Sequence, residues 1–318
     1  VTEGGRYRGN IGFNKFNDNQ RVSVIFNTNN LNEQGFSFSD VAGGGGGGGR
    51  GGGGGGGGGT GLTKSLSTGI NYSDQWGSKI KISGSYFFST SKNNQEQSTL
   101  RQSFFTDSTA VLNRQSYSNN LNQNHRFNLR FEYFIDSNNS LLYTPSVVLQ
   151  HSESNREDTS FTNAVVPDGE YLAIRGETQN TGTRNGLSWN NELLFRHRFR
   201  KIGRTFTAGW KNTIGNSEND GFTFSENVFL QKDGNPYRTI SQNQKNDQEG
   251  TTNNNVLSAS YTEPFGVGKM LELNYAYTYN LNTSDRKVMD YNSTSKEYDQ
   301  LNLPLTNNFE NKFLAHRY

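Results

Sequence analysis

The stretch Phe127-Asn-Leu-Arg-Phe-Glu-Tyr133 decides the fold. Every odd-numbered position in it is apolar or aromatic, and every even-numbered position is polar or charged. Successive side chains of a β-strand point to opposite faces, so this alternation predicts a strand with one apolar and one polar face. Residues 271–281 repeat the pattern, with Leu or Tyr at every odd position. A helix would need apolar residues three and four apart, so it fits neither stretch.

The same template predicts ten strands and the beginning of an eleventh along the chain. The eleventh runs from about residue 308 to 318 and has Phe309 and Phe313 as its weaker apolar markers. The apolar markers of the first ten are, in order, Tyr7, Ile11 and Phe13; Val22, Val24 and Phe26; Leu66, Ile70 and Tyr72; Ile80, Ile82, Tyr86 and Phe88; the 127–133 stretch; Leu141, Tyr143, Val147 and Leu149; Leu187, Trp189, Leu193 and Phe195; Phe206, Ala208 and Trp210; Leu257, Ala259 and Tyr261; and the 271–281 stretch.

The connections between these strands alternate in length. Short polar turns are predicted at 17–20, 73–78, 136–139, 201–204 and 264–269. Long segments rich in Asn, Ser, Thr, Asp and Gly separate the hairpins, at 31–62, 89–117, 152–184, 215–254 and 282–306. Connections in compact soluble domains have a median of about four to six residues, whereas outer-membrane barrels combine short periplasmic turns with long extracellular loops. The pattern therefore favours an antiparallel up-and-down transmembrane β-barrel, of which this chain supplies about ten or eleven strands.

The composition agrees with such a barrel. Only 30% of the 318 residues are hydrophobic and the mean hydropathy is −0.85, although globular proteins have about 45 to 50% apolar residues. No stretch approaches the roughly 18 apolar residues of a membrane-spanning helix. Aromatic residues make up 13% of the chain, which argues against general disorder. A barrel wall meets lipid with alternate residues only, so a low hydrophobic content is expected of it.

The polar face of the strands carries an excess of basic residues. We predict that it lines the lumen of the barrel, where it would attract anionic solutes or contact acidic residues of an inserted plug. The alternative is that any aqueous lumen needs a charged lining, with Arg and Glu pairing across neighbouring strands. The candidate lumen-lining residues are Arg8, Arg21, Lys79, Lys81, Arg126, Arg130, Glu132, Glu192, Arg196, Arg198 and Lys211, accompanied by Arg6 and Asn10.

Aromatic residues near the short turns are candidates for the periplasmic girdle, where Tyr and Trp rings lie at the level of the lipid headgroups. These candidates are Phe13, Phe16, Tyr72, Trp76, Phe134, Phe199 and Phe265.

The sequence gives no support to an enzyme, a cofactor or a metal site. The four histidines lie in separate segments without metal-ligand spacing, and there are no cysteines. The acidic segment 216–220 is expected to be a solvated loop and lacks the spacing of an EF-hand. Residues 43–59 are glycine except for Arg50, but no Gly-Lys-Ser/Thr follows, so a phosphate-binding loop is not indicated. The net charge of +2 gives no reason to expect nucleic acid. We expect the polyglycine run to be a flexible tether, either a mobile flap or a tolerated insertion.

Several segments resemble a known family. They are Gly9-Asn-Ile-Gly-Phe-Asn-Lys-Phe16, Gln20-Arg-Val-Ser-Val24, Asn27-Thr-Asn-Asn-Leu-Asn-Glu-Gln-Gly-Phe-Ser-Phe38 with the polyglycine run behind it, Trp76-Gly-Ser-Lys-Ile-Lys-Ile-Ser-Gly-Ser-Tyr86, and Asn308-Phe-Glu-Asn-Lys-Phe313. Together they resemble the outer-membrane β-barrel family of Bacteroidetes related to TonB-dependent receptors. The resemblance implies a large barrel of about 22 strands, an N-terminal plug and import energised through TonB.

Residues 1–318 are accordingly expected to be an internal section of an outer-membrane barrel of a Gram-negative bacterium, with 31–62 as an extracellular polyglycine loop. The expected function is part of a receptor or transporter that binds and imports an unknown solute. The alternative is a non-transporting surface protein, such as an adhesin or a glycan-binding barrel. The expected partners are outer-membrane lipid, a plug domain of the same parent chain, TonB and a surface lipoprotein.

Overall fold

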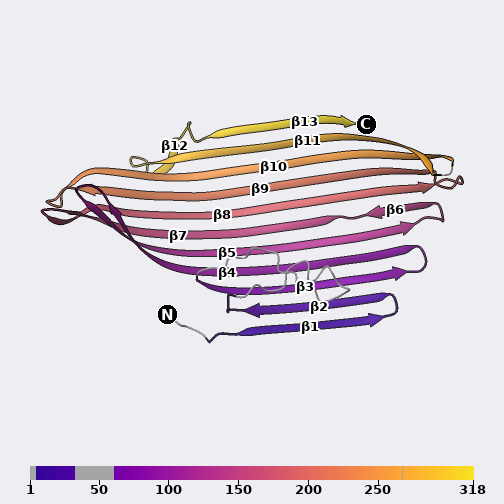
Figure 1. Ribbon diagram of the computed structural model, residues 1–318, viewed down its shortest axis with the longest axis horizontal. Helices are drawn as coiled ribbons and strands as arrows, with labels where there is room; N and C mark the ends of the chain where they lie inside the picture. The colour runs from indigo at the N-terminus through magenta and orange to yellow at the C-terminus, as the bar shows by residue number, and fades with distance from the viewer. Residues whose placement is uncertain (1–4, 33–60, 267) are drawn as a thin grey trace.

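The computed structural model describes residues 5–32, 61–266 and 268–318, which form one antiparallel sheet of thirteen strands (Figure 1). No helix within these residues is long and apolar enough to cross a membrane. The strands are β1 (Arg8–Asn17), β2 (Gln20–Asn29), β3 (Leu62–Trp76), β4 (Ile80–Phe104), β5 (Thr109–Phe134), β6 (Asn139–Tyr143), β7 (Ser146–Val166), β8 (Gly169–Arg198), β9 (Thr205–Leu230), β10 (Pro236–Gly266), β11 (Lys269–Asn292), β12 (Glu297–Leu301) and β13 (Asn307–Arg317).

The topology is strictly up-and-down, as the alternating pattern predicts. β6 and β7 are two parts of one strand, because both lie between β5 and β8. Thr144 and Pro145 separate them, and proline has no backbone N–H to continue the ladder. Backbone hydrogen bonds still connect this break to both neighbouring strands. Thr144 N donates to Glu192 O at 2.8 Å, and Leu129 N donates to Pro145 O at 3.0 Å. β12 and β13 likewise follow one another along the same side of β11, so β12 is the first part of the eleventh strand. All eleven strands expected from the sequence are therefore present.

The long connections differ from the irregular loops expected. Segments 89–117, 152–184 and 215–254 are mostly continuations of β4, β5, β7, β8, β9 and β10, five of which have 25 to 31 residues. The acidic segment 216–220 accordingly lies within β9. Apolar residues are sparse in these outer parts and show no long run of alternation, so the hairpins are extended mainly by the backbone ladder. Residues 33–60, which include the polyglycine run, lie outside the described residues.

The register keeps one face apolar across the sheet. Phe127 of β5 is opposite Tyr86 of β4 and Val147 of β7, and Trp189 of β8 is opposite Val147 and Ile214 of β9. We call this side the apolar face and the other the polar face. The apolar band is the part of the apolar face next to the short turns; it consists of alternate residues of 80–88, 127–133, 141–149, 187–195, 206–214, 257–261 and 271–281.

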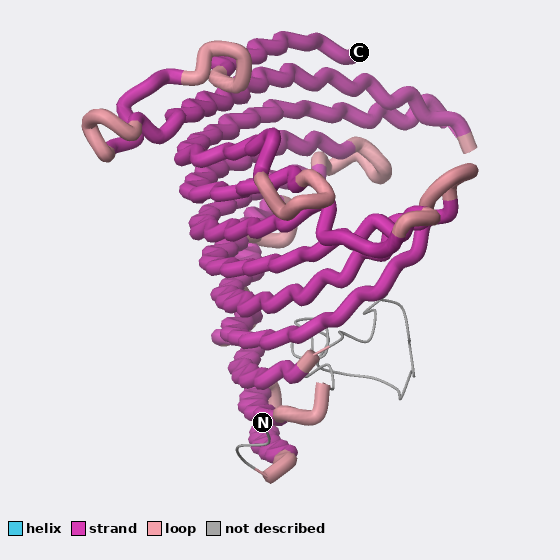
Figure 2. The backbone as a smooth tube through the Cα atoms, turned by 90° about the vertical axis from the view of Figure 1, so that its left-hand side faces the viewer, coloured by secondary structure: helices cyan, strands magenta, loops and turns pink. Residues whose placement is uncertain are grey.

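The sheet is a single layer without a conventional core. Apolar-band side chains such as Phe127 (44% exposed), Leu149 (47%) and Leu273 (57%) remain open to the surroundings. Within the described residues the buried hydrophobic side chains are Phe87, Leu142 and Val288. The sheet is twisted and curved rather than flat (Figure 2). The scarcity of hydrophobic residues thus reflects a wall that is one strand layer thick.

The last strand corrects one prediction. Phe309 and Phe313 were expected to mark the apolar side of the eleventh strand, but they lie opposite Ser284 and Asn280 on the polar face. Leu314 instead lies opposite Tyr279 on the apolar face. Shifting the register by one residue moves every side chain to the other face, and β13 is paired on one side only among the described strands. The phenylalanine pattern alone was therefore a poor guide.

A ladder of asparagines crosses the apolar band. Tyr143 Oη donates to Asn191 Oδ1 at 2.8 Å, Asn191 Nδ2 to Asn212 Oδ1 at 3.4 Å, and Asn212 Nδ2 to Asn255 Oδ1 at 2.9 Å. Asn191 and Asn212 are each only 6% exposed. Each amide supplies the partner that its neighbour needs, so the polar groups are tolerated among aromatic residues.

We expect Asn212→Ala to lower the free energy of unfolding by about 1–3 kcal/mol, because Asn191 and Asn255 would each lose a hydrogen-bond partner in an apolar setting. Asn253, which is exposed, accepts a hydrogen bond from Asn255 Nδ2 at 2.8 Å and ends the ladder. Asn253→Ala is therefore the control and should cost less. Denaturant titration in lipid vesicles measures both. An equal effect of the two variants would contradict the ladder's role.

Candidate functional site

The strand-borne candidate residues all share the polar face. Opposite residues of an antiparallel pair lie on the same face, and the registers link Lys81 with Glu132 and Glu192 with Lys211. Followed across the sheet, the registers place ten of the eleven predicted lumen-lining residues on this face, namely Arg8, Arg21, Lys81, Arg126, Arg130, Glu132, Glu192, Arg196, Arg198 and Lys211. Lys79 lies in the turn between β3 and β4, and Asn10 joins the set on β1.

Glu132 gathers basic residues from two strands. Arg130 Nη2 of β5 lies 3.3 Å from Glu132 Oε2, and Arg196 Nη1 of β8 lies 3.4 Å from Glu132 Oε1. Glu192 forms a separate pair with Lys211, with 3.0 Å between Oε1 and Nζ. The cross-strand pairing that the sequence suggested as an alternative therefore exists around both glutamates.

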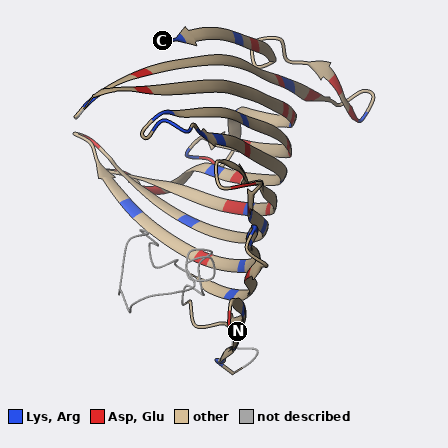
Figure 3. Ribbon diagram, turned by 90° about the vertical axis from the view of Figure 1, so that its right-hand side faces the viewer, with Lys and Arg blue, Asp and Glu red and all other residues tan. Residues whose placement is uncertain are grey.

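That pairing leaves a basic excess. The predicted set has nine basic and two acidic members, a difference of seven positive charges. Within the described residues, Arg21, Arg126 and Arg198 form no ion pair. Lys81 Nζ lies over the Phe134 ring at 5.4 Å, and Lys79 Nζ donates to the Ile135 carbonyl at 3.2 Å. Charged residues are otherwise interspersed along the strands (Figure 3). The local excess can attract anions, as focused surface charge does.

A hollow of about 390 Å³ adjoins this basic cluster near the short turns. Arg21, Lys81, Arg130 and Glu132 contribute to its lining, together with Asp18 of the β1–β2 turn. Asp18 adopts a φ of 46° in that two-residue turn, a left-handed conformation that Asp tolerates better than most residues. The sequence predicted the turn and the charges, and the structure places them around one concavity.

A second hollow on the polar face was missed in the sequence. It has a volume of about 410 Å³, and its floor includes Gly186, Gly215 and Gly250 from three neighbouring strands. A Cβ at position 250 would lie 2.9 Å from Ser217 Oγ, so glycine keeps the trough open there. Amide and hydroxyl side chains surround the floor; they include Gln150, Ser188, Ser217, Gln248 and Asn282. The glycines are far apart in sequence, and only the strand register brings them together.

The girdle candidates divide between the two faces. Phe13, Tyr72 and Trp76 lie on the apolar face, as expected. Phe16 and Phe134 lie opposite Arg21 and Ser140 and so belong to the polar face, which corrects the prediction. Phe199 contacts the apolar-face residues His197 and Tyr261, with ring centroids 4.3 and 6.1 Å apart. Proximity to a turn does not tell which face a side chain takes. The face depends on whether the residue is at an odd or an even position of its strand.

The histidines make separate local contacts. His125 Nδ1 is 2.7 Å from Tyr86 Oη, His197 Nδ1 is 2.7 Å from Asn139 Oδ1, and His316 Nδ1 is 2.9 Å from Tyr275 Oη. His151 Nδ1 is 2.8 Å from Asn185 Oδ1. In the part of the chain that the structure describes, no group of three His, Asp or Glu side chains is arranged to hold a metal ion.

Comparisons with known proteins add no family to this geometry. No protein-family model matches the chain, and no curated protein matches it either.

Proposed function

We propose that the chain forms part of the wall of an outer-membrane β-barrel receptor or transporter of a Gram-negative bacterium, which binds and imports an anionic solute. One observation carries the proposal: strand after strand presents an apolar band on one side and the basic residues on the other. The band spans about nine to eleven residues on its longest strands, close to the tilted span of a bilayer core. Short turns bound it at one end and long hairpins at the other.

Completion of the barrel would require further strands. Within the described residues β1 pairs only with β2, and β13 only with β11. These edge strands point in the same direction (Figure 1), so joining them directly would create a parallel pair. An antiparallel barrel with an even strand number, as in bacterial outer membranes, would add an odd number of strands to the eleven present. A plug, TonB and a surface lipoprotein are the partners that this proposal entails.

The polar face supplies the basis for solute preference. Arg21, Arg126 and Arg198 have no carboxylate partner within the described residues, and the Glu132 cluster borders a hollow. Concentrated positive charge raises the local concentration and association rate of anions, and salt weakens the effect. The glycine-floored trough adds amide and hydroxyl groups that can bind a hydroxylated or peptide-like solute.

Uptake by intact cells tests the proposal. Cells with and without the full-length protein are given a mixture of anionic and neutral oligosaccharides and peptides, and depletion is followed by mass spectrometry with and without a protonophore. We expect selective depletion of anionic components that stops when the proton-motive force is removed. The triple variant Arg21→Gln, Arg126→Gln, Arg198→Gln should slow it about tenfold at low salt.

The matched control removes the same charge from the apolar face, in the variant Lys92→Gln, Lys287→Gln, Lys312→Gln. It should leave uptake unchanged. In another outcome, the protein is released from membranes only by detergent and reaches the cell surface, yet depletes no component of the mixture. That result would favour the alternative function of a non-transporting adhesin or glycan-binding barrel. Loss of uptake in both triple variants would contradict a role for the polar face.

A further inference from the structure

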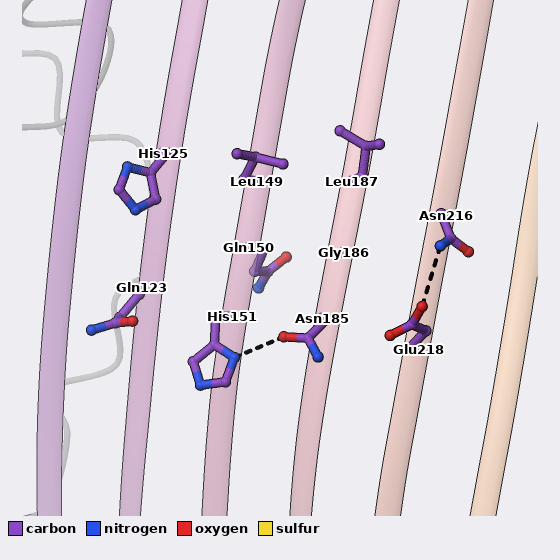
Figure 4. Close-up of a pocket in the computed structure, with 10 residues that line it drawn as sticks. All are labelled: Gln123, His125, Leu149, Gln150, His151, Asn185, Gly186, Leu187, Asn216 and Glu218. Carbon is purple, nitrogen blue, oxygen red and sulfur yellow. Dashed lines mark hydrogen bonds between the residues drawn. The ribbon is translucent and has the colours of Figure 1, made fainter.

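A hollow of about 310 Å³ lies on the apolar face where the apolar band ends (Figure 4). Its lining comes from β5, β7, β8 and β9, and Figure 4 shows the side chains spread across these neighbouring strands. Leu149 and Leu187, the last residues of the apolar band on their strands, line the side of the hollow nearer the short turns and are 47% and 36% exposed. His151, Asn185 and Glu218 lie one row farther from the short turns. The hollow is therefore apolar on the side of the band and polar on the side of the long hairpins.

The apolar band continues from the hollow toward the short turns. The next row toward the short turns contains Phe127, Val147, Trp189 and Ile214. Each of them lies directly opposite the next on the neighbouring strand. Phe127, Trp189 and Ile214 are 38 to 44% exposed. An acyl chain can pass over this row toward the middle of the apolar band while a polar headgroup occupies the hollow, which is the arrangement of an amphiphile at a membrane interface.

The polar side of the hollow has one open carboxylate. His151 is engaged on both nitrogens, with Asn185 Oδ1 at 2.8 Å and Glu153 Oε1 at 3.1 Å. Glu218 accepts a weak hydrogen bond from Asn216 Nδ2 at 3.5 Å and forms no ion pair within the described residues. Asn216 and Asn185 place amide oxygens nearby, so the hollow presents acceptors to a hydrogen-bond donor.

The surroundings determine the charge of the headgroup that fits. Glu218 is directly opposite Glu249, which is opposite Asp285, and Asp220 is directly opposite Asp247. Of the lysines in these two rows, Lys287 lies 3.9 Å from Asp285, and Lys92 of β4 lies four strands away from Asp220. Like charges directly opposite each other destabilise a sheet. A bound cation next to Glu218 and Asp220 would relieve that repulsion, whereas an anionic headgroup would increase it.

We propose that this hollow binds a membrane amphiphile whose headgroup carries a primary ammonium, with the ammonium at Glu218 and the acyl chain along Trp189. A primary ammonium has three N–H donors for the carboxylate and the amide oxygens. The trimethylammonium of a choline headgroup has none. The inference rests on the proposed membrane location of the chain.

Quenching of Trp189 fluorescence by brominated lipids tests the inference. The full-length protein, with Trp76, Trp210 and every tryptophan outside these 318 residues replaced by phenylalanine, is placed in phosphatidylcholine vesicles. A tenth of the lipid is replaced by acyl-brominated phosphatidylethanolamine, phosphatidylcholine or phosphatidylglycerol. We expect the ethanolamine lipid to quench Trp189 at least twofold more than the other two. Adding Glu218→Gln with Asp220→Asn should remove that preference.

The control pair is Glu177→Gln with Glu226→Gln, which are also opposite each other on the apolar face but lie far toward the hairpin tips. It should keep the preference. Equal quenching by the three lipids, stronger quenching by phosphatidylglycerol, or a preference that survives in the Glu218 and Asp220 variant would overturn the inference. Absence of quenching by every brominated lipid would instead show that the chain does not enter the bilayer, and the proposed function itself would fail.

Discussion

Leu193→Arg is expected to lower the free energy of unfolding in lipid vesicles by about 2–4 kcal/mol, the cost of a charge on the lipid side of a barrel near the bilayer midplane. Leu193 lies within the apolar band, opposite Tyr143 and Trp210. The apolar Leu193 side chain would be replaced by a guanidinium group that has neither water nor a carboxylate beside it. Chemical denaturation of the reconstituted protein measures the change.

Ser188→Arg is the matched control for this variant. Ser188 is on the same strand within the span of the apolar band, but it lies on the polar face opposite Val148 and Gly215. Gly215 has no side chain, which leaves room for the arginine, and the existing charges on this face show that it accepts polar groups. We expect a change below about 1 kcal/mol, as for most surface substitutions. Similar losses for both variants would mean that the two faces do not meet different solvents.

Glu263→Gln is expected to destabilise the protein at neutral pH and to have progressively less effect in acid. Glu263 lies beside the short turns, outside the apolar band. Its carboxylate receives Arg204 Nε at 2.6 Å, Arg204 Nη2 at 2.8 Å and Lys201 Nζ at 2.6 Å. Tyr261 Oη donates a further bond at 2.7 Å. The Arg204 bonds, followed by those of Lys201 and Tyr261, hold the pKa of Glu263 far below its usual range.

The direction of the pH effect follows from that lowered pKa. A carboxyl whose folded-state pKa is depressed contributes stability above its unfolded pKa, here the ordinary value of 4.5, and loses it as the pH falls toward the folded value. The wild-type protein should therefore lose its advantage over Glu263→Gln below about pH 4.5. Unfolding midpoints recorded between pH 3 and 8 give the comparison.

Asp168→Asn provides the control, because the pair of Asp168 with Lys232 is highly exposed, with side chains 83% and 57% accessible. Exposed pairs contribute little to stability, so this variant should follow the wild type at each pH. A constant difference between wild type and Glu263→Gln at all pH values would show that the glutamate acts through packing rather than charge.

The sequence predicted the elements that depend on side-chain alternation. In 127–133 and 271–281 each residue's parity reveals its face, because the two faces of a wall strand meet different surroundings. The same parity placed Arg130 and Arg196 on one side before their strands were paired. The short turns were predictable from clusters of polar turn residues such as Asp136 and Asn139. Asp136 Oδ1 indeed accepts the Asn138 and Asn139 backbone N–H groups at 2.7 and 2.8 Å.

The outer halves of β4, β5, β7, β8, β9 and β10 could not be recognised in the same way. Polar residues predominate on both faces of these segments, so alternation carries little signal, and the strands exist because backbone groups pair with neighbouring strands. The sequence also showed no sign of two hollows. One is the glycine-floored trough on the polar face, and the other is the hollow of about 310 Å³ on the apolar face. Their residues are scattered over positions 148–284 and 123–218, respectively, and they converge through inter-strand register.

By itself, then, the sequence determined the all-β class, the up-and-down order and the faces of the regularly alternating stretches such as 127–133 and 271–281, because these depend on neighbours along a single strand. Only the tertiary structure decided the length of the hairpins, the faces of Phe16, Phe134, Phe309 and Phe313, and the grouping of Glu132 with Arg130 and Arg196. Those features depend on which residue of one strand lies opposite which residue of the next. The pairing is set by cooperative hydrogen bonding between strands distant in sequence.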